Sequence, residues 1–374
     1  MARLVEIDKA AWGRYLPRVV HAPFVQSWPY GEAQTRARRC AAHRFLLLDN
    51  QEEPRGLLQV LSYTVPLLGG LARVNQGPIF FEDAWRATPS IEQVREVTTA
   101  ILRTTRARRW WHLGIAPNFP ARADVYATLE QLGLRKTTPF CRGSALIDLQ
   151  GTAEAIRAGL HPRWRNRLQK AEAAGMELES PPAEEALPWF IENYEQMMRE
   201  KGCQAIGRRL LQEMMKQDVE TWAFRILCAR SGDERIGAHI VVGYGDTCTH
   251  FIDWVSPKGR ELLSIYYLFW HGILLGKQLG YRHFDVGGLD PATWSGVAQF
   301  KRNLRPEKYC LAGEHAYSCL PIPFRRCYRS FTPLCRLARA VCDIRNSGSA
   351  LDAPLDETVV CNESARAAGI HGID

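Results

Sequence analysis

Two short stretches in the second half of the chain combine residue types that could do chemistry. Phe284-Asp285-Val286-Gly287-Gly288 has the pattern of a buried strand that ends in two glycines, and a loop separates it from Phe300-Lys301. Glycines at a strand end let a substrate approach the backbone, and α/β sheets usually bind ligands at the carboxyl ends of their strands. The pattern therefore marks a candidate ligand site beside a carboxylate and an ammonium. The alternative is a solvated Lys301 on an ordinary amphipathic turn.

The elements that would position these residues follow from apolar periodicity and from turn residues. In the second half, the pattern predicts strands at 222–229, 235–243, 247–254, 283–286 and 308–317, and helices at 164–174, 184–201, 208–217, 261–279 and 295–303. In the first half, it predicts strands at 43–48, 56–63, 72–81, 110–115 and 144–149, and helices at 90–108 and 121–132. Both halves thus have a mixed α/β (α+β) composition.

The second half repeats the plan of the first, which predicts two similar units. One local echo supports this: Glu130-Gln131-Leu132-Gly133-Leu134 matches Lys277-Gln278-Leu279-Gly280-Tyr281, each ending a helix at glycine. We expect residues 1–148 and 149–318 to form two similarly wound α/β units around one cleft. Residues 319–374 form a C-terminal extension, which we expect to be partly disordered.

Composition limits the class of protein. The chain has 374 residues, a net charge of +8 and a pI near 9.0, which favours anionic partners and is compatible with peripheral membrane contact. Its eleven cysteines form no Cys-x-x-Cys pair, and no zinc spacing is present, so we expect reduced thiols and no metal. The N-terminus lacks the apolar core of a signal peptide, and the apolar run 262–276 is too short to span a bilayer. These features predict a cytoplasmic protein.

The joint between the halves carries a basic ridge, which consists of Arg163, Arg167 and Lys170. Pro162 suits the first turn of a helix, and the helical spacing then places these three side chains together. Glu172 is the only acid between residues 163 and 176. The ridge predicts contact with phosphates, whereas the plainer interpretation is a solvated charged face.

Five motifs in order resemble the Fem family of aminoacyltransferases across residues 20–318. They are the segments 24–28, 75–78, 161–166, 284–288 and 296–301. The resemblance implies two tandem N-acetyltransferase-like (GNAT) units with mixed central sheets. It also implies transfer of an amino acid from aminoacyl-tRNA to an amine, on a cell-wall precursor peptide or on a peptide of secondary metabolism, without a cofactor.

The resemblance also implies roles for individual residues. Lys301 matches the lysine that serves the transferred group, where its ammonium can meet the developing oxyanion, and Phe300 would position it. Asp285 would accept a proton from the attacking amine or cap the glycine turn. Arg163, Arg167 and Lys170 would bind tRNA. Substrate contacts are implied at Trp28, Arg36, Arg199, Arg208, Trp254, Gly287 and Gly288.

At three places the sequence departs from the family pattern, and these differences affect the choice of donor and acceptor. The segment 255–261, where acyl-CoA enzymes bind pyrophosphate on backbone amides, has one glycine and a proline, so a standard CoA site is disfavoured. Gln34 stands where the family has a lysine near the nucleotide diphosphate, which puts the usual cell-wall acceptor in question. A tyrosine expected after 199–203 is absent at 210–212.

Two other classes remain open. The nearer is a CoA-dependent N-acyltransferase of the same fold, acting on an amino sugar or polysaccharide precursor. The other is a non-catalytic RNA-binding module, which would not need Lys301. His239, His250 and His271 lie on apolar segments, and we interpret them as core histidines with satisfied hydrogen bonds.

Overall fold

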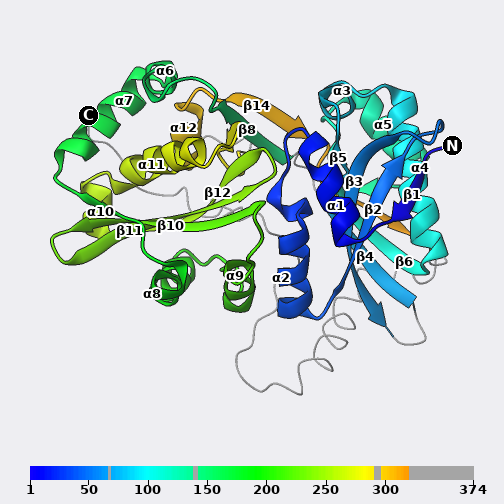
Figure 1. Cartoon of the computed structure of the whole chain (residues 1–374), viewed down its shortest axis with the longest axis horizontal. Coiled ribbons are helices and arrows are strands. Elements are labelled where there is room, and N and C mark those ends of the chain that lie inside the picture. The colour runs from blue at the N-terminus through cyan, green and yellow to red at the C-terminus, as the bar shows by residue number, and fades with distance from the viewer. Residues whose placement is uncertain (66–68, 138–141, 290–295, 320–374) are drawn as a thin grey trace, which may run out of the picture.

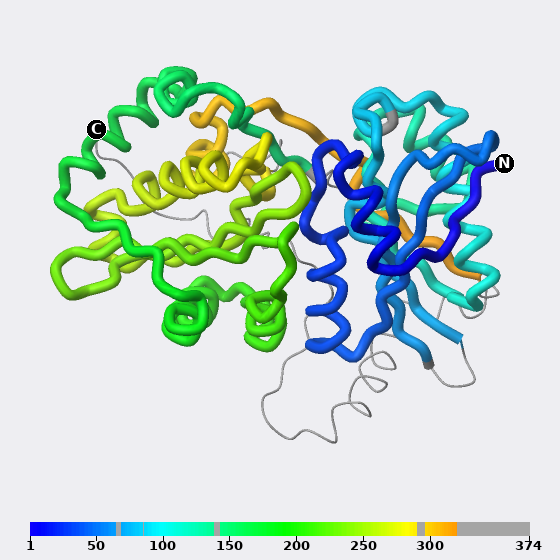
Figure 2. Tube along the Cα trace, viewed as in Figure 1, coloured from blue at the N-terminus to red at the C-terminus, as the bar shows by residue number. Residues whose placement is uncertain are grey.

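The computed structural model describes residues 1–65, 69–137, 142–289 and 296–319, and it contains two β-sheets side by side (Figure 1). The Cα trace in Figure 2 shows that the N-terminal half surrounds one sheet and that most of the C-terminal half surrounds the other. We call these the first and the second sheet. The predicted fold class, two α/β units with mixed central sheets, is confirmed. The expected C-terminal extension lies outside the described residues apart from Cys319.

The first half supplies strands β1 to β8 and helices α1 to α5. The strands are β1 (Arg3–Glu6), β2 (Ala41–Leu48), β3 (Pro54–Val65), β4 (Gly69–Gly77), β5 (Ile79–Phe80), β6 (Trp110–Pro117), β7 (Arg135–Lys136) and β8 (Arg142–Asp148). The helices are α1 (Lys9–Tyr15), α2 (Trp28–Arg38), α3 (Asp83–Ala87), α4 (Ile91–Ala107) and α5 (Ala123–Gln131), with short 3-10 turns at Leu16–Arg18 and Phe24–Gln26.

The second half supplies the remaining elements. Its strands are β9 (Glu177–Glu179), β10 (Trp222–Ser231), β11 (Glu234–Tyr244), β12 (Thr247–Val255), β13 (His283–Asp285), β14 (Glu307–Leu311) and β15 (His315–Ser318). Its helices are α6 (Ala153–Gly159), α7 (Pro162–Ala173), α8 (Ala183–Glu200), α9 (Arg208–Met215), α10 (Pro257–Glu261), α11 (Ser264–Gln278) and α12 (Gly296–Arg302).

The order of strands is the same in the two sheets. The first sheet runs β1-β2-β3-β4-β6-β15-β7, and the second runs β9-β10-β11-β12-β13-β8-β14. In each, four successive strands pair antiparallel, and the fourth pairs in parallel with a strand reached through helices. That strand then pairs antiparallel with a strand from the other half of the chain. The expectation of two similarly wound units is therefore met in strand order.

The two halves exchange one strand each, which corrects two predictions. β8 was expected to complete the first unit, but it pairs with β13 and β14 in the second sheet. The single strand expected at 308–317 is two strands, β14 in the second sheet and β15 in the first. Strand pairing depends on distant partners, so a local pattern predicts a strand without predicting its sheet.

The two matching segments, 130–134 and 277–281, have the same local structure, but the helices that they end are not equivalent in the two units. Gly133 and Gly280 have φ of 87° and 84°, and each follows a helix end in the left-handed conformation that glycine adopts without strain. However, α5 follows the parallel strand β6, whereas α11 precedes the parallel strand β13. The sequence match therefore reflects only that both helices end at a left-handed glycine. The repeated strand order is better evidence that the two units are related.

The two halves pack through a shared hydrophobic core. This core joins α1 and α2 of the first half to α8, α9 and β10 to β12 of the second, with Trp12, Tyr30, Phe190 and Tyr244 fully buried in it. Asp246 adds a polar link, because its carboxylate accepts the backbone N–H groups of His21 at 2.9 Å and Ala22 at 3.0 Å. The sheets are thereby held together on the side of α2 and α9 (Figure 1).

The cysteines agree only partly with the expected thiols. Cys40, Cys228, Cys248 and Cys319 are free. Cys203 and Cys310 are disulfide-bonded, so the expectation of reduced thiols is wrong for these two. Within the described ranges, no helix is long and apolar enough to cross a membrane, and no cluster of metal-ligating side chains is found.

Candidate active site

The candidate site lies where β12 and β13 separate. The two strands pair in parallel at three positions, the last being Thr249 opposite Asp285. β13 then ends, while β12 continues to Val255 against β11 with a bulge near His250. We call this place the strand junction. It consists of His250 on β12, the Gly287-Gly288 turn after β13, and Lys301, which enters from α12.

Glycine at 287 is required by the geometry of the turn. Its φ of 71° lies in the left-handed region, and an added Cβ would lie 2.7 Å from the carbonyl oxygen of His250 and 3.6 Å from Nζ of Lys301. A Cβ at Gly288 would meet no atom within 4 Å. The turn is therefore tight on the side of His250 and open at Gly288.

Lys301 is buried at the junction, so the alternative of a solvated lysine is wrong. Lys301 is only 7% exposed, and its Nζ donates a hydrogen bond of 2.9 Å to the carbonyl oxygen of Gly288. Burial lowers the pKa of Lys301 from 10.5 to about 8, although the carboxylates of Asp253 and Asp285 oppose that shift. The ammonium thus predominates at neutral pH, in surroundings of low polarity where its charge acts strongly.

Phe300 belongs to an aromatic wall around the lysine. Its ring centroid lies 4.9 Å from Tyr266, 5.2 Å from Phe269 and 5.8 Å from Trp164. These residues come from α11 and α7, so the wall fixes α12 against both helices. The fixed helix also holds the neighbouring Lys301, and the role of Phe300 in positioning that lysine for a reaction stays a prediction.

Asp285 is the centre of a buried hydrogen-bond network. One oxygen accepts from Gly287 N at 2.8 Å and from Ser144 Oγ, and the other accepts from Tyr309 Oη at 2.7 Å. His21 Nε2 lies 3.4 Å from the second oxygen. Burial would raise the pKa of Asp285, but the hydrogen bonds from His21, Ser144 and Tyr309 hold it below its ordinary value. The bond to Gly287 favours capping over proton transfer, because a carboxylate that already has four hydrogen-bonding partners has no free oxygen lone pair directed at a substrate.

The basic ridge lies on α7, the helix that also supports the junction. Arg163, Arg167 and Lys170 are exposed, while Trp164 on the inner side of α7 contacts Phe300. Glu172, the acid near the ridge, is paired with Arg157 at 2.6 Å. The ridge is therefore a positive surface one helix away from Lys301.

The other predicted substrate residues lie elsewhere. The ring of Trp254 packs on Trp189 of α8, with centroids 5.3 Å apart, and Arg199 and Arg208 are exposed on α8 and α9. Figure 1 shows α8 and α9 on the face of the second sheet opposite α11 and α12. Trp28 and Arg36 are on α2, which packs against α9, and Trp28 stacks with Arg44 at 4.0 Å. The structure thus groups Lys301, Phe300, Asp285, Gly287 and Gly288, and separates the remaining five from them.

The turn after β12 offers few free amide groups for an anion. Pro257 at its start has no N–H, and Gly259 N donates to Ser256 Oγ at 3.0 Å. Arg260 N donates to the carbonyl of Ser256 at 3.0 Å. In acyl-CoA enzymes this position binds pyrophosphate through exposed amides, whereas the amides of Gly259 and Arg260 are engaged within the turn.

Sequence reasoning missed several residues at the junction. His239 and His250 were expected to be core histidines, and they are buried, but they also form a hydrogen-bonded pair next to Lys301. Asp253 on β12 acts electrostatically on Lys301. His21 reaches Asp285 from the other half of the chain. Single polar residues within apolar strands gave no local signal for these contacts.

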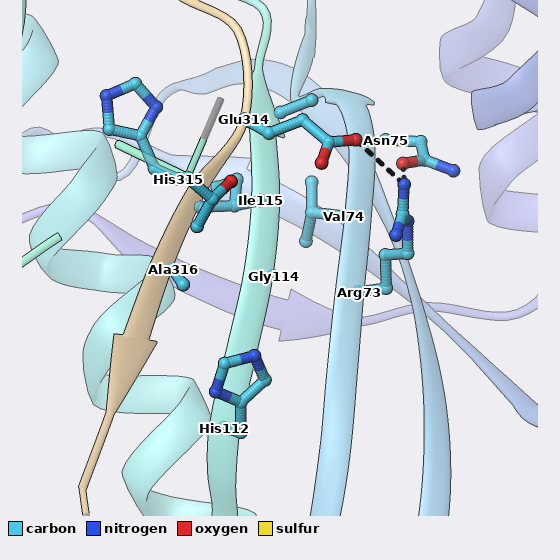
Figure 3. Close-up of a pocket in the computed structure, with 11 residues that line it drawn as sticks. Arg73, Val74, Asn75, His112, Gly114, Ile115, Glu314, His315 and Ala316 are labelled. Atoms are coloured by element: carbon cyan, nitrogen blue, oxygen red, sulfur yellow. Dashed lines mark hydrogen bonds and ion pairs between the residues drawn. The ribbon is translucent and has the colours of Figure 1, made fainter. Parts of the chain in front are cut away.

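A separate cavity of about 160 Å³ lies on the first sheet (Figure 3). Residues of β4, β6 and β15 line it, and a Cβ added at Gly114 on its floor would meet no atom within 4 Å. Arg73 and Glu314 lie side by side at its rim and form an ion pair of 2.9 Å. It shares no lining residue with the strand junction, so we treat it as a distinct feature.

Comparisons with known proteins agree with this fold. Residues 162–302 match the family described as acetyltransferase (GNAT) domain. A crystal structure of FemX matches with a TM-score of 0.70 and 13% identity, covering 87% of this chain and 99% of that one. A tandem GNAT protein from the clavulanic acid biosynthesis pathway matches with a TM-score of 0.48 and 13% identity, over 86% and 99% of the two chains. L-PGS from Bacillus licheniformis matches with a TM-score of 0.47 and 15% identity, over 86% and 95%.

No curated protein matches the sequence. The GNAT match covers α7 to α12 and so includes the strand junction with Lys301. Because the first sheet repeats the strand order of the second, and the FemX structure matches 87% of the chain, the chain has the fold of FemX with two GNAT-like units in tandem, and residues 162–302 match the GNAT acetyltransferase domain family.

Proposed function

We propose that the protein is an aminoacyltransferase that moves an amino acid from aminoacyl-tRNA to an amine and forms an amide bond. The observation that carries the proposal is the buried ammonium of Lys301 at the junction of β12 and β13. An aminoacyl ester is already activated, so the reaction needs alignment and stabilisation of the oxyanion, without a nucleophilic side chain, metal or cofactor.

In the proposed reaction, the neutral amine attacks the ester carbonyl carbon beside Lys301. The new C–N bond gives a tetrahedral intermediate, and the ammonium of Lys301 stabilises its oxyanion. The C–O bond to the terminal ribose of the tRNA then breaks, and the proton lost by the amine ends on that ribose oxygen. Phe300 and its aromatic neighbours keep water away from the ester.

Two features support tRNA as the donor. The basic ridge Arg163, Arg167 and Lys170 lies on the outer side of the helix whose inner side contacts Phe300. Exposed cations at that place can bind phosphates of an acceptor stem. The turn after β12, by contrast, has most of its amides engaged, which weakens the case for CoA.

A CoA-dependent N-acyltransferase is the second candidate, because the GNAT match covers the same residues. On this alternative, the amine of an amino sugar or polysaccharide precursor would attack a thioester carbonyl beside Lys301, and the CoA thiol would leave. An RNA-binding module without catalysis explains the ridge but gives no role to a buried lysine.

We further propose that residues 1–148 carry the acceptor side and residues 149–318 the donor side. The acceptor is an amine on a peptide, of a cell-wall precursor or of secondary metabolism, and Gln34 argues against a standard diphosphate contact. Since charged tRNA is found in the cytoplasm, we propose that the protein works there, in peripheral contact with the membrane if the acceptor is lipid-linked.

A donor competition tests the proposal. Wild-type protein is mixed with total tRNA charged with a labelled amino-acid mixture, or with labelled acetyl-CoA, and with short peptides that carry free amines. We expect label to pass to peptide from tRNA only, in a reaction that ribonuclease abolishes. Saturable transfer from acetyl-CoA without tRNA would support the second candidate, and tRNA binding without any transfer would support an RNA-binding module.

A further inference from the structure

Two buried histidines connect helix α11 to the strand junction. His239 Nδ1 lies 3.2 Å from the carbonyl oxygen of Leu268, and His239 Nε2 lies 2.8 Å from His250 Nδ1. His239 is fully buried and His250 is 8% exposed. Phe269 packs on both rings, at 5.4 Å and 5.0 Å, and also on Phe300. The pair is therefore a fixed chain of hydrogen bonds that ends at the junction.

The chain of bonds determines which nitrogens carry hydrogen. A carbonyl oxygen can only accept, so His239 Nδ1 carries the N–H. Burial lowers the pKa of His239 to about 4, so the ring is neutral and its Nε2 has a lone pair. His250 Nδ1 must then donate to it. Burial, His239 and Lys301 hold the pKa of His250 well below 6.5, which leaves its Nε2 as an acceptor.

Helix α11 has a glycine where the chain of bonds requires one. A Cβ at Gly272 would lie 2.8 Å from Cε1 and 3.1 Å from Nδ1 of His239. Only a residue without a side chain lets the imidazole reach the helix backbone at Leu268. Glycine inside a helix is less stable than alanine, so the glycine at position 272 is explained by the contact between His239 and the helix backbone and not by helix stability.

His250 directs its free edge at the glycine turn. Its Cδ2, the atom bonded to Nε2, would lie 3.1 Å from a Cβ placed on Gly287, and Lys301 Nζ would lie 3.6 Å from the same point. No described residue makes a hydrogen bond to Nε2 of His250. The Cδ2–Nε2 edge of His250 and the ammonium of Lys301 thus both lie close to Gly287, next to the open position at Gly288.

We propose that His250 is the proton acceptor of the transfer reaction, and that His239 and the Leu268 carbonyl are positioning groups that fix its tautomer. The proposal deepens the proposed function and rests on it, because it assumes attack by an amine at Lys301. The amine forms its C–N bond and passes a proton to Nε2 of His250. As the C–O bond breaks, that proton moves to the leaving ribose oxygen.

The charges around His250 suit this cycle. The titratable groups of the surrounding elements are His239 on β11, Asp253 on β12, Asp285 on β13 and Lys301 on α12, while α11 presents Phe269 and a carbonyl. Lys301 disfavours a protonated His250 in the resting protein. The developing oxyanion offsets the charge of Lys301, so the histidine becomes a better base only when the tetrahedral intermediate forms.

Two readouts test the proposal, one of them independent of activity. Long-range proton–nitrogen spectra of protein labelled in histidine should show His250 with hydrogen on Nδ1 and none on Nε2. In single-turnover transfer, His250→Gln should lower the rate constant by about a hundredfold to ten-thousandfold, the usual contribution of a general base. Glutamine keeps an amide donor for His239 but cannot take a proton, so this variant separates packing from chemistry.

A remote variant and its control test the positioning role. Gly272→Ala should push His239 away and lower the rate by about tenfold or more, with altered histidine signals, since small misplacements near a reacting centre have large effects. Gly13→Ala on α1, where a Cβ meets nothing within 4 Å, should leave the rate unchanged.

The possible failures are distinguishable. If wild-type protein transfers nothing from charged tRNA, the proposed donor is wrong, and the tautomer of His250 still decides the present inference. Hydrogen on Nε2 of His250 would overturn it. So would a His250→Gln variant that transfers at the wild-type rate while Lys301→Ala is inactive.

Discussion

The two sheets have the same strand order, yet only the second separates at its parallel pair. In the first sheet, β4 and β6 are in register at seven positions, from Gly70 opposite Trp110 to Gly77 opposite Pro117. In the second, β12 and β13 are in register at three. The same topology therefore gives a closed sheet in one half and a junction in the other. A buried lysine at that junction is what makes the second half the candidate for chemistry.

The residues at equivalent places show why the sheets differ. In the second sheet, the pairing of β12 with β13 ends at Asp285, just before the left-handed Gly287, and Lys301 reaches the opening. The bulge near His250 lies in the pairing of β12 with β11 on its other side. On the first sheet, the pairing continues, and the cavity at Arg73 and Glu314 lies on the sheet surface instead of between strands. A surface cavity with a paired arginine suits binding, whereas the junction suits stabilisation of charge.

The strongest test of this comparison removes the ammonium from the junction. Lys301→Ala should lower the single-turnover rate constant by about a hundredfold to a thousandfold, as for loss of one oxyanion donor, with little change in substrate binding. Lys301→Arg should rescue poorly, because a planar fork does not replace a compact ammonium. Lys136→Ala, an exposed lysine of the first half, is the control and should match wild type. Equal rates in all variants would remove the lysine from the mechanism.

The second test concerns stability, since the buried ammonium opposes folding. The folded pKa of about 8 lies below the ordinary 10.5, so the unfolded chain binds more protons between these values. Stability should therefore rise with pH from 8 to 10.5, and the full penalty should be present below pH 8. Lys301→Met should stabilise the protein at neutral pH by up to about 3 kcal/mol while abolishing transfer. Denaturant unfolding across pH measures this, and a destabilised Lys301→Met would show that the ammonium is well paired.

A third test closes the junction from the other side. Gly287→Ala forces a left-handed alanine, at about 1–2 kcal/mol, and places Cβ against the His250 carbonyl, so transfer should fall at least about tenfold. Gly133→Ala in the first half has a similar φ but meets only ring atoms of Tyr317 at 3.5 Å. It should lose stability without losing activity. Similar rate losses in both variants would mean that strain, not closure of the junction, is responsible.

The smallest expected effect is on donor binding. Replacing Arg163, Arg167 and Lys170 together by alanine should raise the apparent dissociation constant for tRNA several-fold. The rate of the chemical step should not change. Because each phosphate contact releases counterions, the slope of the logarithm of the binding constant against the logarithm of the salt concentration should shrink by up to about 3. Binding should be measured over a series of salt concentrations. An unchanged slope would show that the basic ridge does not bind tRNA phosphates.

The sequence by itself determined the local elements and the motif at the site. Ser90 and Gln93 form the capping box that begins α4, and apolar spacing along that helix predicts its buried face. Phe284 to Gly288 predicts a buried strand that ends in a glycine turn, and Phe300-Lys301 predicts a helix with a lysine. These features depend on neighbours within a few residues, which is why a pattern can reveal them.

Only the tertiary structure decided which strands share a sheet and what surrounds Lys301. β8 and β15 join the sheet of the other half because their partners lie far away in the sequence, so no local period encodes the exchange. The burial of Lys301 results from packing of α12 against α7 and α11. His239 and His250 lie eleven residues apart on neighbouring strands, and only the pairing of β11 with β12 brings their rings together. Strand partners, burial and the meeting of side chains are properties of the packed chain, because each depends on surfaces that no single segment contains.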